Sequence, residues 1–208
     1  MLNNIQWLGH STIKILGDKI IYIDPYNIKE DFNDADIIII THNHYDHFSK
    51  ADLNKCRNSN TRIVITEDLY EEVIQLGFYK EKVRTVLPNN NYIIEGLSFS
   101  TIPAYNIDKQ FHPKNNNWVG YVININNTTC YIAGDTDITD EARKVKCDVA
   151  FLPVGGTYTM DYNEASDLAN DIKPKIVIPI HYGTIVGTIQ DALKFKSNLN
   201  SNIKCVIL

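Results

Sequence analysis

The stretch Asp36–Ser49, DIIIITHNHYDHFS, joins two patterns that decide the fold and the chemistry of this chain. Its first part is a continuous apolar run, which is typical of a strand buried on both faces. Its second part places three of the chain's six histidines, together with an aspartate, within six positions. We therefore expect a buried strand that ends in a loop crowded with imidazole and carboxylate groups.

The loop reads H-x-H-x-D-H over His42, His44, Asp46 and His47. Imidazole and carboxylate form the ligand set that divalent zinc, manganese and iron accept. Two residues spaced i, i+2 in extended chain point to the same side, and a turn after them can bring Asp46 and His47 to the same pocket. The alternative is a solvated loop with incidental histidines. Four suitable residue types in one register favour a site for two neighbouring metal ions.

Composition narrows the class of protein. A length of 208 residues is enough for one compact domain spanning residues 1–208. The net charge of -5, without a basic run, argues against long nucleic acids as partners. No apolar run approaches the ~20 residues of a membrane helix, and no export signal begins the sequence, so we expect no membrane insertion. Four scattered cysteines without a CxxC pair fit reduced thiols in the cytoplasm.

Further along the chain, short apolar and β-branched segments recur in two series, and helical patterns follow each series. Gly17-Asp18 separates two such segments and predicts a hairpin. Helices are expected over residues 49–54, 67–76, 163–171 and 190–197. This order predicts two sheets packed face to face with helices outside. The Asn-rich stretch 105–117 lacks periodicity and is predicted to be a functional loop.

Three other segments also carry an aspartate or a histidine at the end of an apolar strand. YIDPY precedes the motif loop, whereas YIAGDTD around Asp135 and IPIHYG around His181 follow it. Together these segments resemble the metallo-β-lactamase superfamily over nearly the whole chain. WLGHST, PAYN, AGDTD and PVGGTYTM make the chain most similar to the small hydrolases grouped with ascorbate-6-phosphate lactonase and N-acylphosphatidylethanolamine phospholipase D.

The resemblance implies an α/β fold, a four-layer αββα sandwich of two mixed β-sheets with a metal pair at one edge of the sheets. It implies two divalent metal ions, zinc first and manganese or iron as alternatives. The first ion would be held by His42 and His44, and the second by Asp46 and His47. Asp135 would bridge the two ions, and His181 would complete the second set.

One position departs from this family. The strand end STIPAYN carries Tyr105 and Asn106 where the family usually supplies a further histidine to the first metal. The nearest histidine is His112, in the irregular segment FHPK. We expect His112 to act as this ligand because a loop can reach a site that a strand end does not. The alternatives are an Asn106 or water ligand with a weak first site, or a single-metal enzyme.

Several residues are expected to support the site. His10 in WLGHST and Asp24 before Pro25 are interpreted as groups that orient the metal ligands. Thr157 and Tyr158, in the turn GGTYTM, are candidates for substrate contact.

A metal-bound hydroxide would serve as the nucleophile, because a metal ion lowers the pKa of bound water to about 7. Asp46 would also be catalytic, taking the proton of that hydroxide. The predicted function is a metal-dependent hydrolase that cleaves a small-molecule ester, lactone or phosphodiester. The alternative, raised by Tyr105 and Asn106, is a metal-binding or regulatory protein with weak or vestigial catalysis. The sequence leaves the substrate, the metal and any homo-oligomer open.

Overall fold

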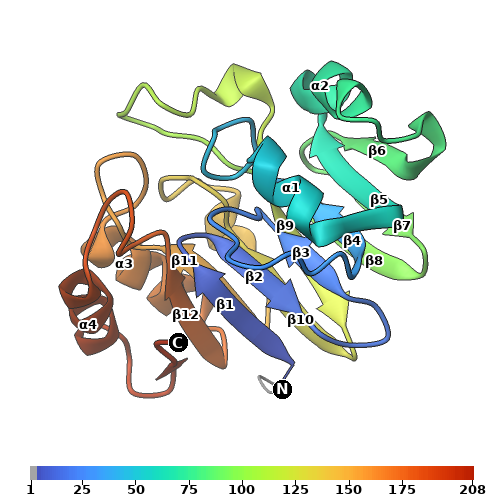
Figure 1. Cartoon of the computed structure of the whole chain (residues 1–208). Coiled ribbons are helices and arrows are strands. Elements are labelled where there is room, and N and C mark those ends of the chain that lie inside the picture. Colours follow the sequence, from blue (N-terminus) through green and yellow to red (C-terminus); the bar gives the residue numbers. More distant parts are fainter. Residues whose placement is uncertain (1–3) are drawn as a thin grey trace. The chain divides into compact units, whose positions relative to one another are not determined.

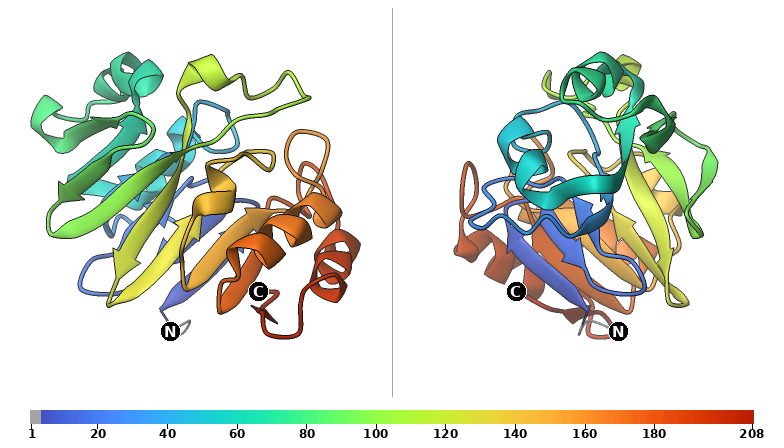
Figure 2. Two further views of the ribbon diagram at one scale, coloured as in Figure 1. Left: turned by 180° about the vertical axis from the view of Figure 1, so that it is seen from behind. Right: turned by 45° about the vertical axis from the view of Figure 1, so that its right-hand side comes forward.

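The computed structural model describes residues 4–208, and the chain forms two compact units, Met1–Leu87 and Pro88–Leu208. Each unit contains a mixed β-sheet and its own helices (Figures 1 and 2). Two mixed sheets with helices agree with the predicted α/β fold class. That the chain works as one domain stays a prediction.

The sheet of the first unit has six strands in sequence order. They are β1 (Ile5–Gly9), β2 (Thr12–Ile15), β3 (Ile21–Ile23), β4 (Ala35–Ile39), β5 (Arg57–Thr66) and β6 (Val83–Val86). The first three are antiparallel, and β3 to β6 are parallel. The predicted hairpin around Gly17-Asp18 is therefore confirmed. Sequence analysis missed β1 and β6, since neither carries a long apolar run.

The helices of the first unit pack against this sheet through apolar side chains. They are α1 (Lys50–Cys56), the short 3-10 turn η1 (Glu67–Leu69), α2 (Tyr70–Gln75) and the 3-10 turn η2 (Lys80–Lys82). Ser49 caps α1 by accepting a hydrogen bond from the Asp52 N–H, so the helix predicted from residue 49 begins one position later. Leu53 of α1 and Val73 of α2 are fully buried in the same apolar cluster as Ile38 of β4.

The sheet of the second unit has seven strands, in the order β13-β12-β11-β10-β9-β8-β7. Strands β7 to β10 are antiparallel neighbours, whereas β10 to β13 are parallel. The strands are β7 (Asn91–Ile94), β8 (Leu97–Pro103), β9 (Val119–Ile125), β10 (Thr128–Ile132), β11 (Val149–Pro153), β12 (Ile176–Ile180) and β13 (Lys204–Cys205). Because parallel strands end at the same edge of a sheet, the segments after β10, β11 and β12 share one edge.

The helices of the second unit follow this parallel part. They are α3 (Tyr162–Ile172) and α4 (Ile189–Ser197), which lie side by side in Figure 1, and the 3-10 turns η3 (Lys114–Asn116) and η4 (Ala142–Lys144). Asp161 and Glu164 form a capping box that starts α3. Both long helices therefore form where predicted: α3 extends one residue further at each end, and α4 begins one residue earlier and ends as predicted. The loop between β8 and β9 contains only η3, as the missing periodicity predicted.

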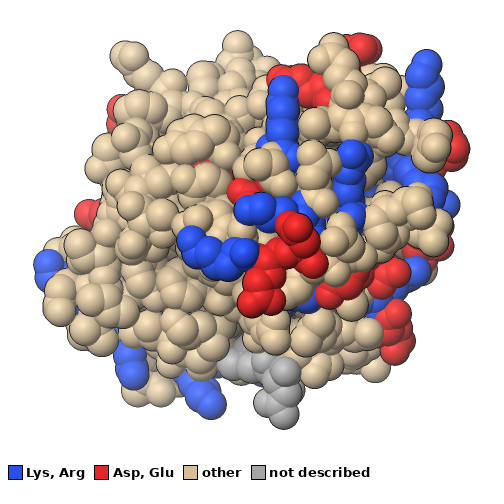
Figure 3. Space-filling view, viewed as in Figure 1, with Lys and Arg blue, Asp and Glu red and all other residues tan. Residues whose placement is uncertain are grey.

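The surface charge and the hydropathy of the helices can be compared with what the sequence predicts. On the face drawn in Figure 3, basic and acidic side chains are intermingled, without a continuous basic field. Of the helices in residues 4–208, none has the length and apolarity to span a membrane.

Candidate metal centre

The motif loop of the first unit begins directly after β4. The chain bends over residues 42–44, where the sequence predicted extended chain. It then turns because the N–H groups of His47 and Phe48 both donate to the His44 carbonyl, at 3.0 and 2.7 Å. His42, Asp46 and His47 are buried, and His44 is half-buried. The turn brings the later part of the motif back beside the earlier part, as the sequence predicted.

The motif loop presents its ligand atoms in two close pairs. His42 Nε2 lies 3.1 Å from His44 Nδ1, and His47 Nε2 lies 3.6 Å from Asp46 Oδ2. Ligands held about 2.0–2.2 Å from one tetrahedral zinc lie roughly 3.3–3.6 Å from each other. The His47–Asp46 pair has this spacing and the His42–His44 pair is slightly closer, so both pairs lie near the spacing for shared coordination of one metal ion.

The buried residue Asp24 forms hydrogen-bond contacts with this loop. It follows β3 and is 1% exposed, and its carboxylate accepts hydrogen bonds from the Thr41 N–H at 2.8 Å and the Thr41 hydroxyl at 2.7 Å. It also lies 2.8 Å from His47 Nδ1. A carboxylate bound to one ring nitrogen orients the other nitrogen toward a metal. These are the contacts expected of Asp24 from the sequence.

His10 lies in the turn between β1 and β2. Its Nε2 is 2.9 Å from Asp46 Oδ2, and the side chain is 1% exposed. Its ring also packs edge-on to the His47 ring, with the centroids 5.9 Å apart. His10 therefore contacts two motif residues, and its nitrogen is close enough either to orient the Asp46 carboxylate or to join it as a ligand.

The second unit brings together three residues that lie far apart in the sequence. Asp135 follows β10, His181 follows β12 directly, and His112 comes from the loop between β8 and β9. Asp135 Oδ2 lies 3.1 Å from His181 Nε2 and 3.3 Å from His112 Nε2. All three residues are at least 96% buried. One carboxylate oxygen thus lies at coordination spacing from two imidazole nitrogens.

The two residues at the departure from the family pattern have other contacts. The Asn106 side-chain oxygen lies 2.9 Å from His112 Nδ1 and accepts the His112 N–H at 3.0 Å. The Tyr105 hydroxyl donates to Glu141 instead. Asn106 therefore orients the His112 ring, with Nε2 toward Asp135.

Asp137 completes the support of this loop and was missed by sequence analysis. It is buried, and its carboxylate accepts hydrogen bonds from the Ile107 N–H at 2.8 Å, Asn106 Nδ2 at 3.1 Å and Lys109 Nζ at 2.5 Å. The available signal was the second aspartate of GDTD, which follows Asp135 by two positions.

The turn after β11 lies close to His181. A Cβ atom on Gly155 would lie 2.3 Å from the His181 carbonyl oxygen, so only glycine fits there. The candidate substrate residue Thr157 is exposed, and Tyr158 packs edge-on against Phe111 with the ring centroids 4.7 Å apart. The Tyr158 carbonyl accepts from Asn106 Nδ2 at 2.9 Å, which joins this turn to the support of His112.

Four residues at or beside the site have a left-handed backbone conformation. His10, Asp24, Thr157 and His181 have φ angles of 51°, 45°, 52° and 58°. The left-handed region is uncommon for residues other than glycine, and such residues cluster at functional sites. Burial also raises the pKa of Tyr182, next to His181, so this hydroxyl stays protonated at neutral pH.

Comparisons with known proteins match most of the chain. Residues 4–181 match the model of the β-lactamase superfamily domain. A UPF0173 metal-dependent hydrolase of Pyrococcus horikoshii is 32% identical over 218 residues, which cover 98% of this chain and 95% of the relative. A similar protein of Thermococcus kodakarensis is 31% identical with the same coverage.

Solved structures share the fold. The metallo hydrolase Igni18 of Ignicoccus hospitalis superposes with a TM-score of 0.80 and 26% identity, over 98% of this chain and 94% of Igni18. An isothiocyanate hydrolase from Delia radicum gut bacteria, 17% identical, shares the fold with a TM-score of 0.76, over 98% of this chain and 95% of that one. These matches confirm the predicted fold class. With its histidine and aspartate pairs and the match over residues 4–181, this chain belongs to the β-lactamase superfamily.

Proposed function

We propose that this chain is a metal-dependent hydrolase with two divalent metal ions, which cleaves a small ester or lactone. The observation that carries the proposal is the spacing of donor atoms within each unit, from 3.1 to 3.6 Å. Zinc suits these nitrogen and oxygen ligands, and manganese or iron would accept the same set. The proposed ligands are His42, His44 and His112 for one ion, Asp46, His47 and His181 for the other, and Asp135 for both.

His112 is the proposed replacement for the missing strand-end histidine. Its Nδ1 is engaged by Asn106 while its Nε2 lies 3.3 Å from Asp135 Oδ2. A ligating histidine usually binds the metal with one nitrogen and a polar partner with the other. The Asn106 oxygen contacts His112 both through the N–H and the ring. This arrangement favours His112 over Asn106 as the metal ligand.

Asp46, His10 and Asp24 have different proposed roles in the reaction. Divalent metal ions, when bound, supply an activated water and polarise the substrate oxygen under attack. Asp46 would accept the proton released in the attack and return it to the leaving group. His10 holds the Asp46 carboxylate at 2.9 Å and so limits its rotation. Asp24 in turn fixes the His47 ring.

The loop beside His112 favours an apolar substrate. Ile107 is 58% exposed and Phe111 46% exposed, and Phe111 precedes His112 directly. This loop has two lysines, and carboxylates contact both. Lys109 is bound by Asp137 at 2.5 Å and lies 3.8 Å from Glu164, and Lys114 Nζ lies 3.2 Å from Glu141. Because two carboxylates offset its charge, Lys109 is poorly suited to bind a phosphate. We therefore place esters and lactones with an apolar group ahead of phosphodiesters.

The second candidate is a metal-binding or regulatory protein with weak catalysis. The observation in its favour is the substitution of Tyr105 and Asn106 at the usual ligand positions. Metal binding without turnover of any substrate type would support it.

The test combines metal content with activity. Protein purified without chelators and without a nickel column is analysed by plasma mass spectrometry, and the metal found is used in assays with aryl esters, lactones and phosphodiesters. We expect about two metal ions per chain and turnover of esters or lactones. The variant Asp46→Asn should lose about 10²–10⁴-fold in kcat, as expected for a positioned acid-base group. Asp36→Asn, an exposed aspartate of β4, is the matched control and should keep full activity.

His112→Ala tests the unusual ligand by itself. We expect the variant to retain about one metal ion fewer per chain, with the same circular dichroism spectrum as the parent. Unchanged metal content would show that another group completes the first site.

A further inference from the structure

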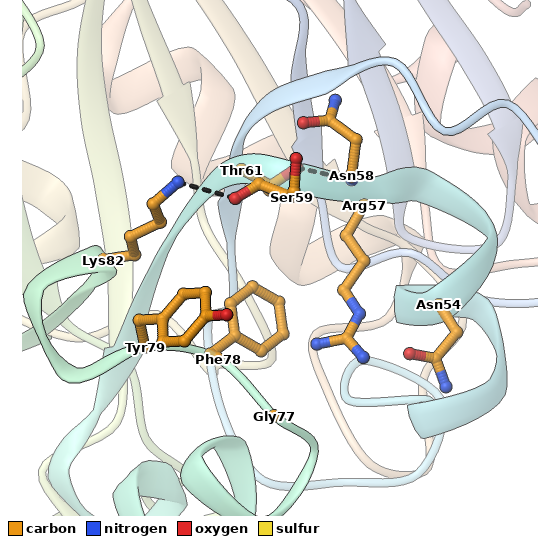
Figure 4. Close-up of a pocket in the computed structure, with 9 residues that line it drawn as sticks. All are labelled: Asn54, Arg57, Asn58, Ser59, Thr61, Gly77, Phe78, Tyr79 and Lys82. Carbon is orange, nitrogen blue, oxygen red and sulfur yellow. Dashed lines mark hydrogen bonds between the residues drawn. The ribbon is translucent and has the colours of Figure 1, made fainter.

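A pocket of about 410 Å³ opens in the first unit, lined by α1, β5 and the segment after α2 (Figure 4). Nine residues line the pocket, and none belongs to the motif loop. Two of them, Arg57 and Lys82, are basic and none is acidic, although the whole chain carries a net charge of -5. We propose that this pocket binds a small aromatic anion, in which a flat ring carries a phosphate or carboxylate group.

Arg57 is held in place by neutral groups. Its Nη2 donates to the Leu76 carbonyl at 2.7 Å, and its guanidinium carbon lies 4.7 Å from the centre of the Phe78 ring. A guanidinium has five N–H donors, in a geometry that matches carboxylate and phosphate. A guanidinium fixed by one carbonyl and one ring keeps further donors for an anion.

Lys82 provides the second charge. Its Nζ donates to the Ser59 carbonyl at 2.6 Å and lies 3.5 Å from the Asn60 side-chain oxygen. Within residues 4–208, neither Lys82 nor Arg57 forms an ion pair with a carboxylate. Hydrogen bonds to neutral oxygens do not cancel the charge, so both cations can attract an anion.

An irregularity in β5 builds one wall of the pocket. Arg57 pairs with Ala35 and Arg62 pairs with Ile37, so four residues of β5 stand opposite a single residue of β4. The Thr61 hydroxyl secures this bulge by donating to the Ala35 carbonyl at 2.6 Å. Bulges are common next to binding sites, because they re-aim polar groups. Here the bulge supplies the carbonyl of Ser59 that holds Lys82.

Aromatic side chains supply the place for a ring. Figure 4 shows Phe78 and Tyr79 between Lys82 and Arg57. Phe78 is buried, whereas Tyr79 is 64% exposed and free to stack on a ligand ring. Gly77, with a φ of 88°, turns the chain after α2 and adds no side chain to the pocket. Rings beside cations are typical of sites for aromatic anions.

The test uses NMR on the full chain with its metal bound, titrated separately with inorganic phosphate, phenyl phosphate and benzoate. We expect phenyl phosphate or benzoate to shift the amide signals of Ser59, Gly77 and Tyr79, and to bind about tenfold more tightly than phosphate because the ring stacks. Tyr79→Ala should remove this preference. The double variant Arg57→Gln, Lys82→Gln should weaken binding of every probe by about tenfold or more.

The matched control is Arg62→Gln, in the same strand outside the pocket, which should bind all probes as the parent does. Lys82→Gln by itself decides the question if the double variant does not fold. Shifts confined to residues 41–48 would place the anion at the metal ligands and overturn the proposal. Equal loss in Arg62→Gln would show attraction by general charge and would also overturn it. Neither result depends on hydrolysis, so this proposal can fail independently of the proposed function.

Discussion

The two units supply their candidate metal ligands in different ways. In the first unit, four candidate ligands lie within six residues of one loop, and a single buried carboxylate, Asp24, holds that loop. In the second unit, His112, Asp135 and His181 come from three separate segments that follow strands β8, β10 and β12. A local turn can form the first group, whereas the second exists only when the sheet has been assembled.

Both units offer histidine and aspartate as candidate ligands, but different kinds of contact hold these side chains in place. The first group is supported by the Asp24 carboxylate, through three hydrogen-bond contacts, and by His10, which contacts Asp46. The second depends on an amide, Asn106, and on the close approach of Gly155 to His181. Three substitutions separate these kinds of support, and a fourth tests an ion pair of the second unit away from the candidate ligands; they run from the largest expected effect to the smallest.

Asp24→Ala should have the largest effect because it leaves the Thr41 N–H and hydroxyl and His47 Nδ1 without their buried carboxylate partner. We expect a loss of about 3 kcal/mol or more in the free energy of unfolding, together with loss of bound metal. Urea denaturation and metal analysis measure both. Asp36→Ala, at an exposed carboxylate with one backbone partner, should cost less than about 1 kcal/mol. Equal losses in both variants would break the comparison.

Gly155→Ala tests the backbone support of the second unit. The added methyl group would meet the His181 carbonyl at 2.3 Å and Val186 Cγ1 at 2.8 Å. We expect about 1–3 kcal/mol of destabilisation and reduced activity, because His181 must shift. Thermal unfolding and ester assays measure these effects. Adding Val186→Ala removes only the side-chain contact, so full recovery in the double variant would show that the backbone approach is unimportant.

Asn106→Ala tests the amide support. Without Asn106, His112 can rotate, and the metal affinity should fall about 10–100-fold with little change in the fold. Competition with a chelator of known affinity gives the size of the effect. Asn115→Ala, at an exposed position of the same loop, is the control and should bind metal normally. If both variants bind metal as the parent does, Asn106 has no role in positioning His112.

Asp148→Asn should have the smallest effect, and only in acid. A hydrogen bond from Lys175 lowers the pKa of Asp148 to about 2, from an ordinary value of 3.8. A lowered pKa stabilises the fold above the ordinary value, and this contribution is lost as the pH falls through the lowered one. The parent should therefore lose stability between about pH 4 and 2, and the variant should lose less. Denaturation curves at these pH values compare the two, and parallel curves would contradict the assignment.

The sequence indicates the candidate ligands of the first unit more directly than those of the second. The H-x-H-x-D-H register is local, so the residue spacing limits where the side chains can point. The contact between His112 and Asp135 spans 23 positions, and no local rule relates their side chains. Strands β1 and β6 escaped prediction because they are stabilised by pairing with neighbours more than by their own apolar pattern.

The sequence by itself determined which residue types can bind metal, the order of most strands and helices, and the family. These follow from spacing and side-chain type, which are properties of the unfolded chain as much as of the folded one. Only the tertiary structure decided that Asn106 turns His112 toward Asp135, that Asp137 supports the loop before His112, and that a bulge in β5 opens a basic pocket. The physical reason is that each of these contacts joins segments whose distance is set by sheet pairing and packing, which no short stretch of sequence records.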